Sequence, residues 1–177
     1  MKLNKIIINT VLIFTLLCST AVAYQPEYKG TYYQKADGTP MDLINNDDAK
    51  RPTYEQVIKF LEKDNTDEHP SDPSSYDCVD FAEELHNNAE AAGLKCGVVD
   101  VNLVEEDIDG VVYRSGHECN VFKLKERSLL FVDCVYGDCI SHAEEGDVYS
   151  IRSIYTGEVS YFEGFEDVEV RDVRIFW

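Results

Sequence analysis

The chain has 177 residues, of which 34 are acidic and 16 are basic, giving a formal net charge of −18 at pH 7. Such a surface repels phosphate backbones, so the composition excludes nucleic acid as an expected partner. Hydrophobic residues make up 44% of the sequence, which is enough to build the core of one domain.

The N-terminus has the features of a secretory signal peptide. The opening residues, MKLNKIIINTVLIFTLLCSTAVAYQ, contain two lysines, an apolar run from Ile6 to Leu17 and a small-residue ending at Ala23. This order predicts a signal peptide over residues 1–23, cleaved after Ala23. The alternative is a retained membrane anchor, for which the apolar run is short. We therefore expect a secreted or cell-surface protein that has no membrane span after cleavage.

The mature chain is expected to begin with an N-terminal arm, residues 24–51, which is rich in tyrosine and contains several turn-forming residues. A single domain, residues 52–177, is expected to follow. It opens with RPTYEQVIKFLEKD, in which Thr53 can cap a helix and Gln56 can close a capping box. The sequence therefore predicts a first helix directly after the arm.

A second helix is predicted in SSYDCVDFAEELHNNAEAAG, residues 74–93. Ser74 or Ser75 can cap it, and Asp77 suits the positive end of its dipole. Gly93 is a natural stop. Residues recurring at spacings of three and four predict a buried stripe along one side, made of Cys78, Ala82, Leu85, Ala89 and Ala92.

Beyond this helix the pattern changes to that of strands. KCGVVDVNLV alternates, and ECNVFKLK and SLLFVDCV form an expected antiparallel pair joined at Glu126-Arg127. DVYSI, GEVSYF and VEVRDVRIFW supply further β-rich segments up to the C-terminus. Helices followed by an antiparallel sheet indicate an α+β fold.

Five cysteines remain after removal of the signal peptide: Cys78, Cys96, Cys119, Cys134 and Cys139. An odd number in an exported chain leaves at least one unpaired thiol. Four of them could form two disulfides, or all five could stay reduced, and the sequence does not decide between these arrangements. We expect Cys78 to be an unpaired thiol.

A zinc site is a further possibility at CVYGDCISH, which offers Cys134, Cys139 and His142. The spacing lacks the fourth ligand and the two close ligand pairs typical of zinc sites. A disulfide within the loop, or free thiols, explains these residues more simply. We therefore expect no metal and no other cofactor.

Cys78 is a candidate nucleophile because it stands in the first turn of the second helix. The positive end of the helix dipole and the unpaired backbone N–H groups there favour a thiolate and predict a lowered thiol pKa. A buried core cysteine is the alternative reading of the same position. His117 and Asp133 lie on either side of the predicted strand turn, where they can meet across the pair. Cysteine, histidine and aspartate together are the nucleophile, base and orienting acid of acyl transfer.

These residues resemble the three core motifs of the transglutaminase-like superfamily. The resemblance rests on DCVDFAEELHNNAEAAGLKCGVV, GHECNVF and LLFVDCV, in that order, and covers about residues 53–135. It implies a papain-like α+β fold, in which the nucleophile helix packs on an antiparallel sheet. It also implies Cys78 as nucleophile, His117 as general base at the start of a strand, and Asp133 as the residue that orients His117.

The function expected from this resemblance is an exported, cysteine-dependent acyl-transfer enzyme acting on amide bonds of peptides or cell-envelope material. A peptidase, an amidase and a transglutaminase all remain open. The alternative is a catalytically inactive transglutaminase-like module that binds peptide or envelope ligands. Cys119 stands two residues after His117, where the family commonly has an aromatic residue, which is one reason to retain the alternative.

Overall fold

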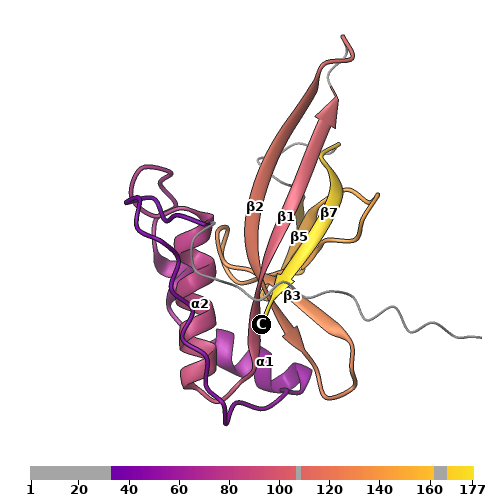
Figure 1. Cartoon of the computed structure of the whole chain (residues 1–177). Helices are drawn as coiled ribbons and strands as arrows, with labels where there is room; N and C mark the ends of the chain where they lie inside the picture. The colour runs from indigo at the N-terminus through magenta and orange to yellow at the C-terminus, as the bar shows by residue number, and fades with distance from the viewer. Residues whose placement is uncertain (1–32, 107–108, 162–166) are drawn as a thin grey trace, which may run out of the picture.

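The computed structural model describes residues 33–106, 109–161 and 167–177. The predicted signal peptide, residues 1–23, lies outside this part. The described chain is α+β, with two α-helices, a short 3-10 helix and a seven-stranded antiparallel sheet (Figure 1). The coarse fold class predicted from the sequence is therefore confirmed. No helix in these residues has both the length and the apolar character needed to cross a membrane.

The helices begin where side chains can cap them. Helix α1, Tyr54–Leu61, starts after Thr53, and Thr53 and Gln56 form the predicted capping box. A 3-10 helix, η1, Thr66–Glu68, follows. Helix α2, Cys78–Ala91, is capped by Asp77. The prediction that Ser74 or Ser75 caps α2 is wrong, because the carboxylate of Asp77 accepts hydrogen bonds from the first free N–H groups of the helix.

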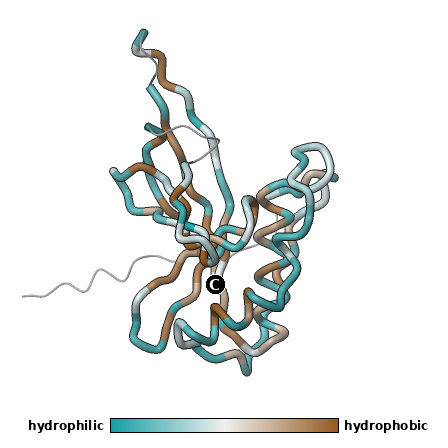
Figure 2. The backbone as a smooth tube through the Cα atoms, turned by 180° about the vertical axis from the view of Figure 1, so that it is seen from behind, coloured by the Kyte–Doolittle hydropathy of each residue, from teal (hydrophilic) through white to brown (hydrophobic). Residues whose placement is uncertain are grey.

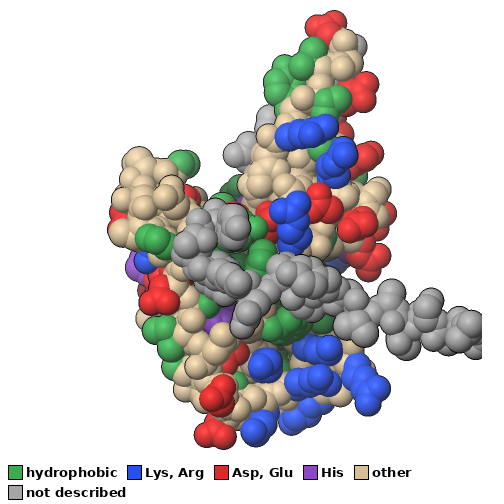
Figure 3. Space-filling view, in the orientation of Figure 1, with side chains coloured by type: hydrophobic (Ala, Val, Ile, Leu, Met, Phe, Trp, Pro, Cys, Tyr) green, Lys and Arg blue, Asp and Glu red, His purple; other side chains and the backbone are tan. Residues whose placement is uncertain are grey.

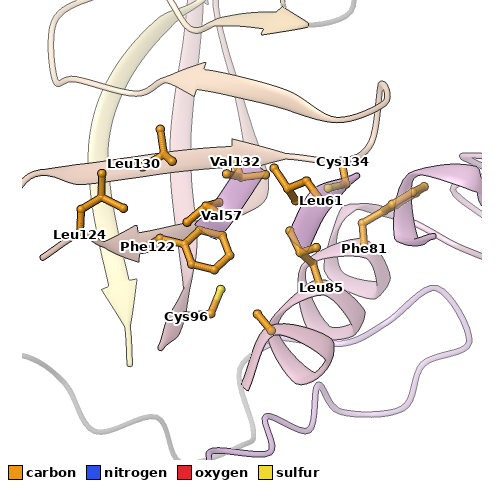
Figure 4. Packing of buried hydrophobic residues seen from close by; sticks show 11 residues of the cluster. Val57, Leu61, Phe81, Leu85, Cys96, Phe122, Leu124, Leu130, Val132 and Cys134 are labelled. Carbon is orange, nitrogen blue, oxygen red and sulfur yellow. The ribbon is translucent and has the colours of Figure 1, made fainter. Parts of the chain in front are cut away.

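The predicted apolar stripe of α2 holds for Ala82, Leu85 and Ala89, all of which are fully buried. Cys78 is only partly buried, and Ala92 is exposed because the helix has already ended there. The α2 stripe packs with α1 over one face of the sheet, which we call the helix face. Figure 4 shows this core, which consists of Val57, Leu61, Phe81, Leu85, Ala89, Cys96, Phe122, Leu124, Leu130, Val132 and Cys134.

The sheet is antiparallel throughout, with strands in the order β6-β5-β4-β3-β2-β1-β7. Every strand predicted from the sequence is present, and β4 was not predicted. The strands are β1 Cys96–Glu106, β2 Val112–Lys123, β3 Leu129–Asp133, β4 Cys139–His142, β5 Ser150–Ser153, β6 Val159–Tyr161 and β7 Glu169–Phe176.

The sheet curls so that its two edges approach each other. The segment before β5 bonds to the start of β7, through Gly146 N to Val170 O and Val170 N to Asp147 O, both 2.8 Å. This curl encloses a second core on the side of the sheet away from the helices, which we call the inner face. It contains Val99, Val101, Leu103, Cys119, Val121, Cys139, Ala143, Tyr149, Ile151, Val168 and Val170. Figure 2 shows the hydrophobic stretches of the strands gathered towards the middle of the molecule.

The described part of the predicted arm, residues 33–51, runs along α2 (Figure 1). Its backbone N–H groups bond to side chains along one side of the helix. Ile44 N donates to Asn87 Oδ1 at 2.7 Å, and Asn46 N donates to Glu90 Oε2 at 3.0 Å. The arm is thus held by α2 side chains, which take the place of a neighbouring strand.

Candidate functional site

Cys78 is the first residue of α2, and its side chain points toward the helix face of the sheet. Its Sγ donates to Glu118 Oε2 at 2.9 Å. The thiol also packs beside a small apolar cluster of Met41, Val79, Ala82 and Val98. A carboxylate on β2 is therefore the polar partner of the thiol.

The surroundings of Cys78 oppose thiolate formation. Burial raises the pKa of the thiol well above its usual value, and the negative charges of Glu118 and Asp77 raise it further. The N–H groups expected to activate the sulfur are already used, since Val79 N donates to Asp77 Oδ1 at 2.9 Å. The prediction of a lowered Cys78 pKa is wrong because burial and the carboxylate of Glu118 raise it, and because the acid that caps the helix start adds to their effect.

His117 and Asp133 form the predicted pair. His117 Nε2 lies 2.7 Å from Asp133 Oδ2, within the expected range for a hydrogen bond. The hydroxyl of Tyr149 donates to the same oxygen at 2.8 Å, and Val135 N donates to Oδ1 at 3.0 Å. Burial alone would raise the pKa of Asp133, but the charge and hydrogen bond of His117 bring it below its usual value. Asp133 is therefore an ionised carboxylate in a buried network.

The pleat of β2 points the two halves of the predicted triad in opposite directions. Successive side chains on a strand face opposite sides of the sheet. Glu118 reaches Cys78 on the helix face, as does Asn120, which donates to Ala82 O of α2 at 2.9 Å. His117 therefore points to the inner face, where its ring packs edge-on against Tyr149. The β1–β2 register is continuous from Cys96↔Phe122 to Glu106↔Val112, so no bulge reverses this alternation.

The predicted position of His117 along its strand is also wrong. The Gly-His segment was expected to start a strand, but β2 begins at Val112 and places His117 near its middle. The first five residues of β2 are exposed, so they lack the alternation of burial that marks a strand in sequence. The sequence also did not predict Tyr149 as a partner of Asp133 or Glu118 as a partner of Cys78. Glu118 could have been found from its position between His117 and Cys119, since any strand there sends it to the opposite face.

The structure decides between the two alternatives for the cysteines, disulfides or free thiols. All five described cysteines are unpaired, Cys78 among them. Cys134 lies in the core of the helix face and Cys139 in the core of the inner face, so a disulfide within that loop is not formed. His142 instead lies beside Glu144 and Asp147, an exposed group whose ligand atoms come within 4.8 Å of one another.

Comparison with protein-family models, with curated proteins and with solved structures found no match. The function of this chain is therefore inferred from its own geometry.

Proposed function

We propose that this chain is an exported, catalytically inactive module of transglutaminase-like fold that binds peptide or cell-envelope ligands. The element order supports the fold. A helix beginning at Cys78 precedes a strand carrying His117 and a following strand ending at Asp133. The observation that favours inactivity is the alternation of β2, which turns Glu118 and not His117 toward the thiol.

Acyl transfer needs the base to take a proton from the nucleophile, so the two groups must be within hydrogen-bonding reach of each other. Here the thiol donates to a carboxylate whose own pKa burial raises. The raised thiol pKa leaves Cys78 protonated at neutral pH. In this reading Cys78 joins α2 to β2, and the His117–Asp133–Tyr149 network joins β2 and β3 to the segment before β5.

Alkylation by iodoacetamide at pH 7 tests the proposal. The rate at Cys78, followed by mass spectrometry of the modified peptide, should be at least about tenfold below that of a free cysteine, because only the thiolate reacts. Glu118→Gln is the informative variant, since it removes one charge that raises the thiol pKa while keeping the shape. It should speed alkylation modestly. Alkylation of the unmodified protein faster than free cysteine, and slowed by His117→Ala, would overturn the proposal.

A stability measurement separates a structural His117 from a catalytic one. Replacing His117 by alanine leaves Asp133 buried without its cation, which costs on the order of 3–5 kcal/mol of unfolding free energy. Tyr149→Phe, which removes one hydrogen bond to the same oxygen, should cost about 1 kcal/mol. A catalytic His117 would be replaceable with little loss of stability, measured by urea unfolding.

A further inference from the structure

Half of the basic side chains of this acidic chain lie at one end of the molecule. They come from segments 50–51, 59–63, 95 and 123–127, and backbone hydrogen bonds bring three of these segments together. Lys95 N donates to Lys50 O and Lys125 N donates to Pro52 O, both at 2.9 Å. We call this the basic end. Its eight cations are Lys50, Arg51, Lys59, Lys63, Lys95, Lys123, Lys125 and Arg127. Figure 3 shows Lys and Arg gathered over the lower part of the molecule.

A groove between α1 and α2 opens at the basic end. Its volume is about 570 Å³, and apolar atoms of Phe60, Leu94 and the two alanines at the C-terminal end of α2, Ala91 and Ala92, line it. Lys59 and Lys63 also line the groove, and Lys125 Nζ donates to Gln56 Oε1 beside them at 3.2 Å. No described residue forms an ion pair with any of these three lysines. The lysines outnumber the one carboxylate of the lining, Asp64, so the groove suits a ligand that carries apolar side chains next to carboxylates.

Apolar side chains next to carboxylates are present at the opposite end of the same molecule. The paired ends of β1 and β2 extend away from α1 (Figure 1). Glu105 and Glu106 end β1, and Val111, Val112 and Tyr113 across from them are each about half exposed, at 49%, 51% and 54%. We call these five residues the hairpin end. Glu106 faces Val112 and Glu105 faces Tyr113, so each carboxylate lies beside an apolar side chain.

We propose that the hairpin end of one copy docks in the α1–α2 groove of a second copy. One face of the hairpin end would enter the groove, so that either Glu106 with Val112 or Glu105 with Tyr113 is inserted. The carboxylate would meet Lys59 and Lys63, while the apolar side chain covers Phe60 and Leu94. The two surfaces differ and lie at opposite ends of the molecule, so the contact is heterologous. A docked pair therefore keeps one groove and one hairpin end for further copies. This inference is independent of the proposed function.

The contact is expected to be weak. A hairpin end covers less surface than a standard protein interface, and the net charge of −18 makes whole copies repel each other. Association should therefore be seen by sedimentation velocity at protein concentrations between about 50 μM and 1 mM in moderate salt, which screens the long-range repulsion more than the close contacts. The purified protein is the sample.

Two charge-reversed variants test the geometry. The groove variant, Lys59→Glu with Lys63→Glu, and the hairpin variant, Glu105→Lys with Glu106→Lys, should each weaken self-association by at least about tenfold. Mixed together, they retain one intact groove and one intact hairpin end. They should associate again, since the intact hairpin end meets the intact groove and the two reversed surfaces also carry opposite charges. Arg152→Glu, at an exposed position on β5, controls for added negative charge and should leave association unchanged.

The outcomes are decisive in both directions. Association of the unmodified protein, its loss in either variant alone and its return in the mixture support the inference. A protein that stays monomeric to 1 mM overturns it, as does association that survives both variants. Binding of polyphosphate or of an acidic peptide at the basic end by a chain that remains monomeric also overturns it, because the groove would then serve another partner.

Discussion

At the scale of single residues, His86 has the least favourable surroundings. Its side chain is fully buried in α2, and neither ring nitrogen has a hydrogen-bond partner in the described chain. Burial lowers the pKa of His86 to about 4, and the nearby positive charge of Lys95 acts in the same direction. A buried polar group without partners reduces the stability of the fold by about 1–3 kcal/mol.

We expect His86→Leu to stabilise the protein. The folded pKa of His86 is depressed below its unfolded value of 6.5, so its unfolded state binds more protons between pH 6.5 and pH 4. Stability is thus lost as the pH falls through this window, and the leucine variant should keep it. The unfolding free energy should rise by about 1–3 kcal/mol at pH 7 and by more at pH 5. Urea unfolding at both values measures this.

The neighbouring Leu85 supplies the control for that experiment, because it is buried in the same helix and has no titratable group. Leu85→Ala should lower the unfolding free energy by the same amount at pH 7 and at pH 5. An His86→Leu variant less stable than the unmodified protein at pH 5 would show that the His86 ring has a partner.

At the scale of elements, α2 holds both the sheet and the N-terminal arm, each through a different side of the helix. One side packs on the sheet, and another binds the extended arm through Glu83, Asn87 and the buried Glu90. These three helix positions accept from Asp42, Ile44 and Asn46, every second residue of the arm. Residues on one face of a helix recur every three to four residues, and residues on one side of an extended chain recur every two. Because an extended chain rises more per residue than a helix, the distances between successive contact positions along the two elements are similar.

Two neighbouring asparagines allow a matched test of this arrangement. Asn87 binds the arm, whereas Asn88 donates to Asp64 Oδ1 at 2.8 Å. Asn87→Ala should speed hydrogen exchange of the Ile44 amide by about tenfold and leave the Thr66 amide unchanged. Asn88→Ala should have the reverse effect. Equal exchange changes in both variants would mean that the arm is held mainly by other contacts.

At the scale of the whole molecule, the stability of the fold depends on packing and hydrogen bonds on both sides of one sheet, without covalent links between described residues. The cysteines are divided between these cores. Cys96 and Cys134 belong to the helix face, and Cys119 and Cys139 to the inner face. Burial raises the pKa of the Cys139 thiol to about 11 and that of the Cys134 thiol well above its usual value, so neither oxidises readily.

Thiol titration tests this account. In denaturant without reductant, the chain from residue 24 onward should yield five free thiols, whereas the folded protein should react much more slowly. The folded-state rate should be slowest for the four buried cysteines. A count of three in denaturant would reveal a disulfide and contradict the arrangement of the two cores.

The sequence by itself determined the local features. The capping residues of α1, the buried stripe of α2, the turn at Glu126-Arg127 and the antiparallel pairing of β2 and β3 all follow from interactions between residues close in the chain. The hydrogen bond between His117 and Asp133 belongs with them, since both residues flank that turn. The expected signal peptide and arm boundary rest on the same local evidence.

Only the tertiary structure decided which groups meet Cys78. The triad prediction required α2 and the imidazole to share a face of the sheet, and strand order alone does not specify that. Moving one residue along β2 changes the face, so packing of Asn120 and Phe122 beneath α2 assigns Glu118 to the thiol and His117 to the inner face. Long-range packing therefore separated residues that the order of the motifs had grouped.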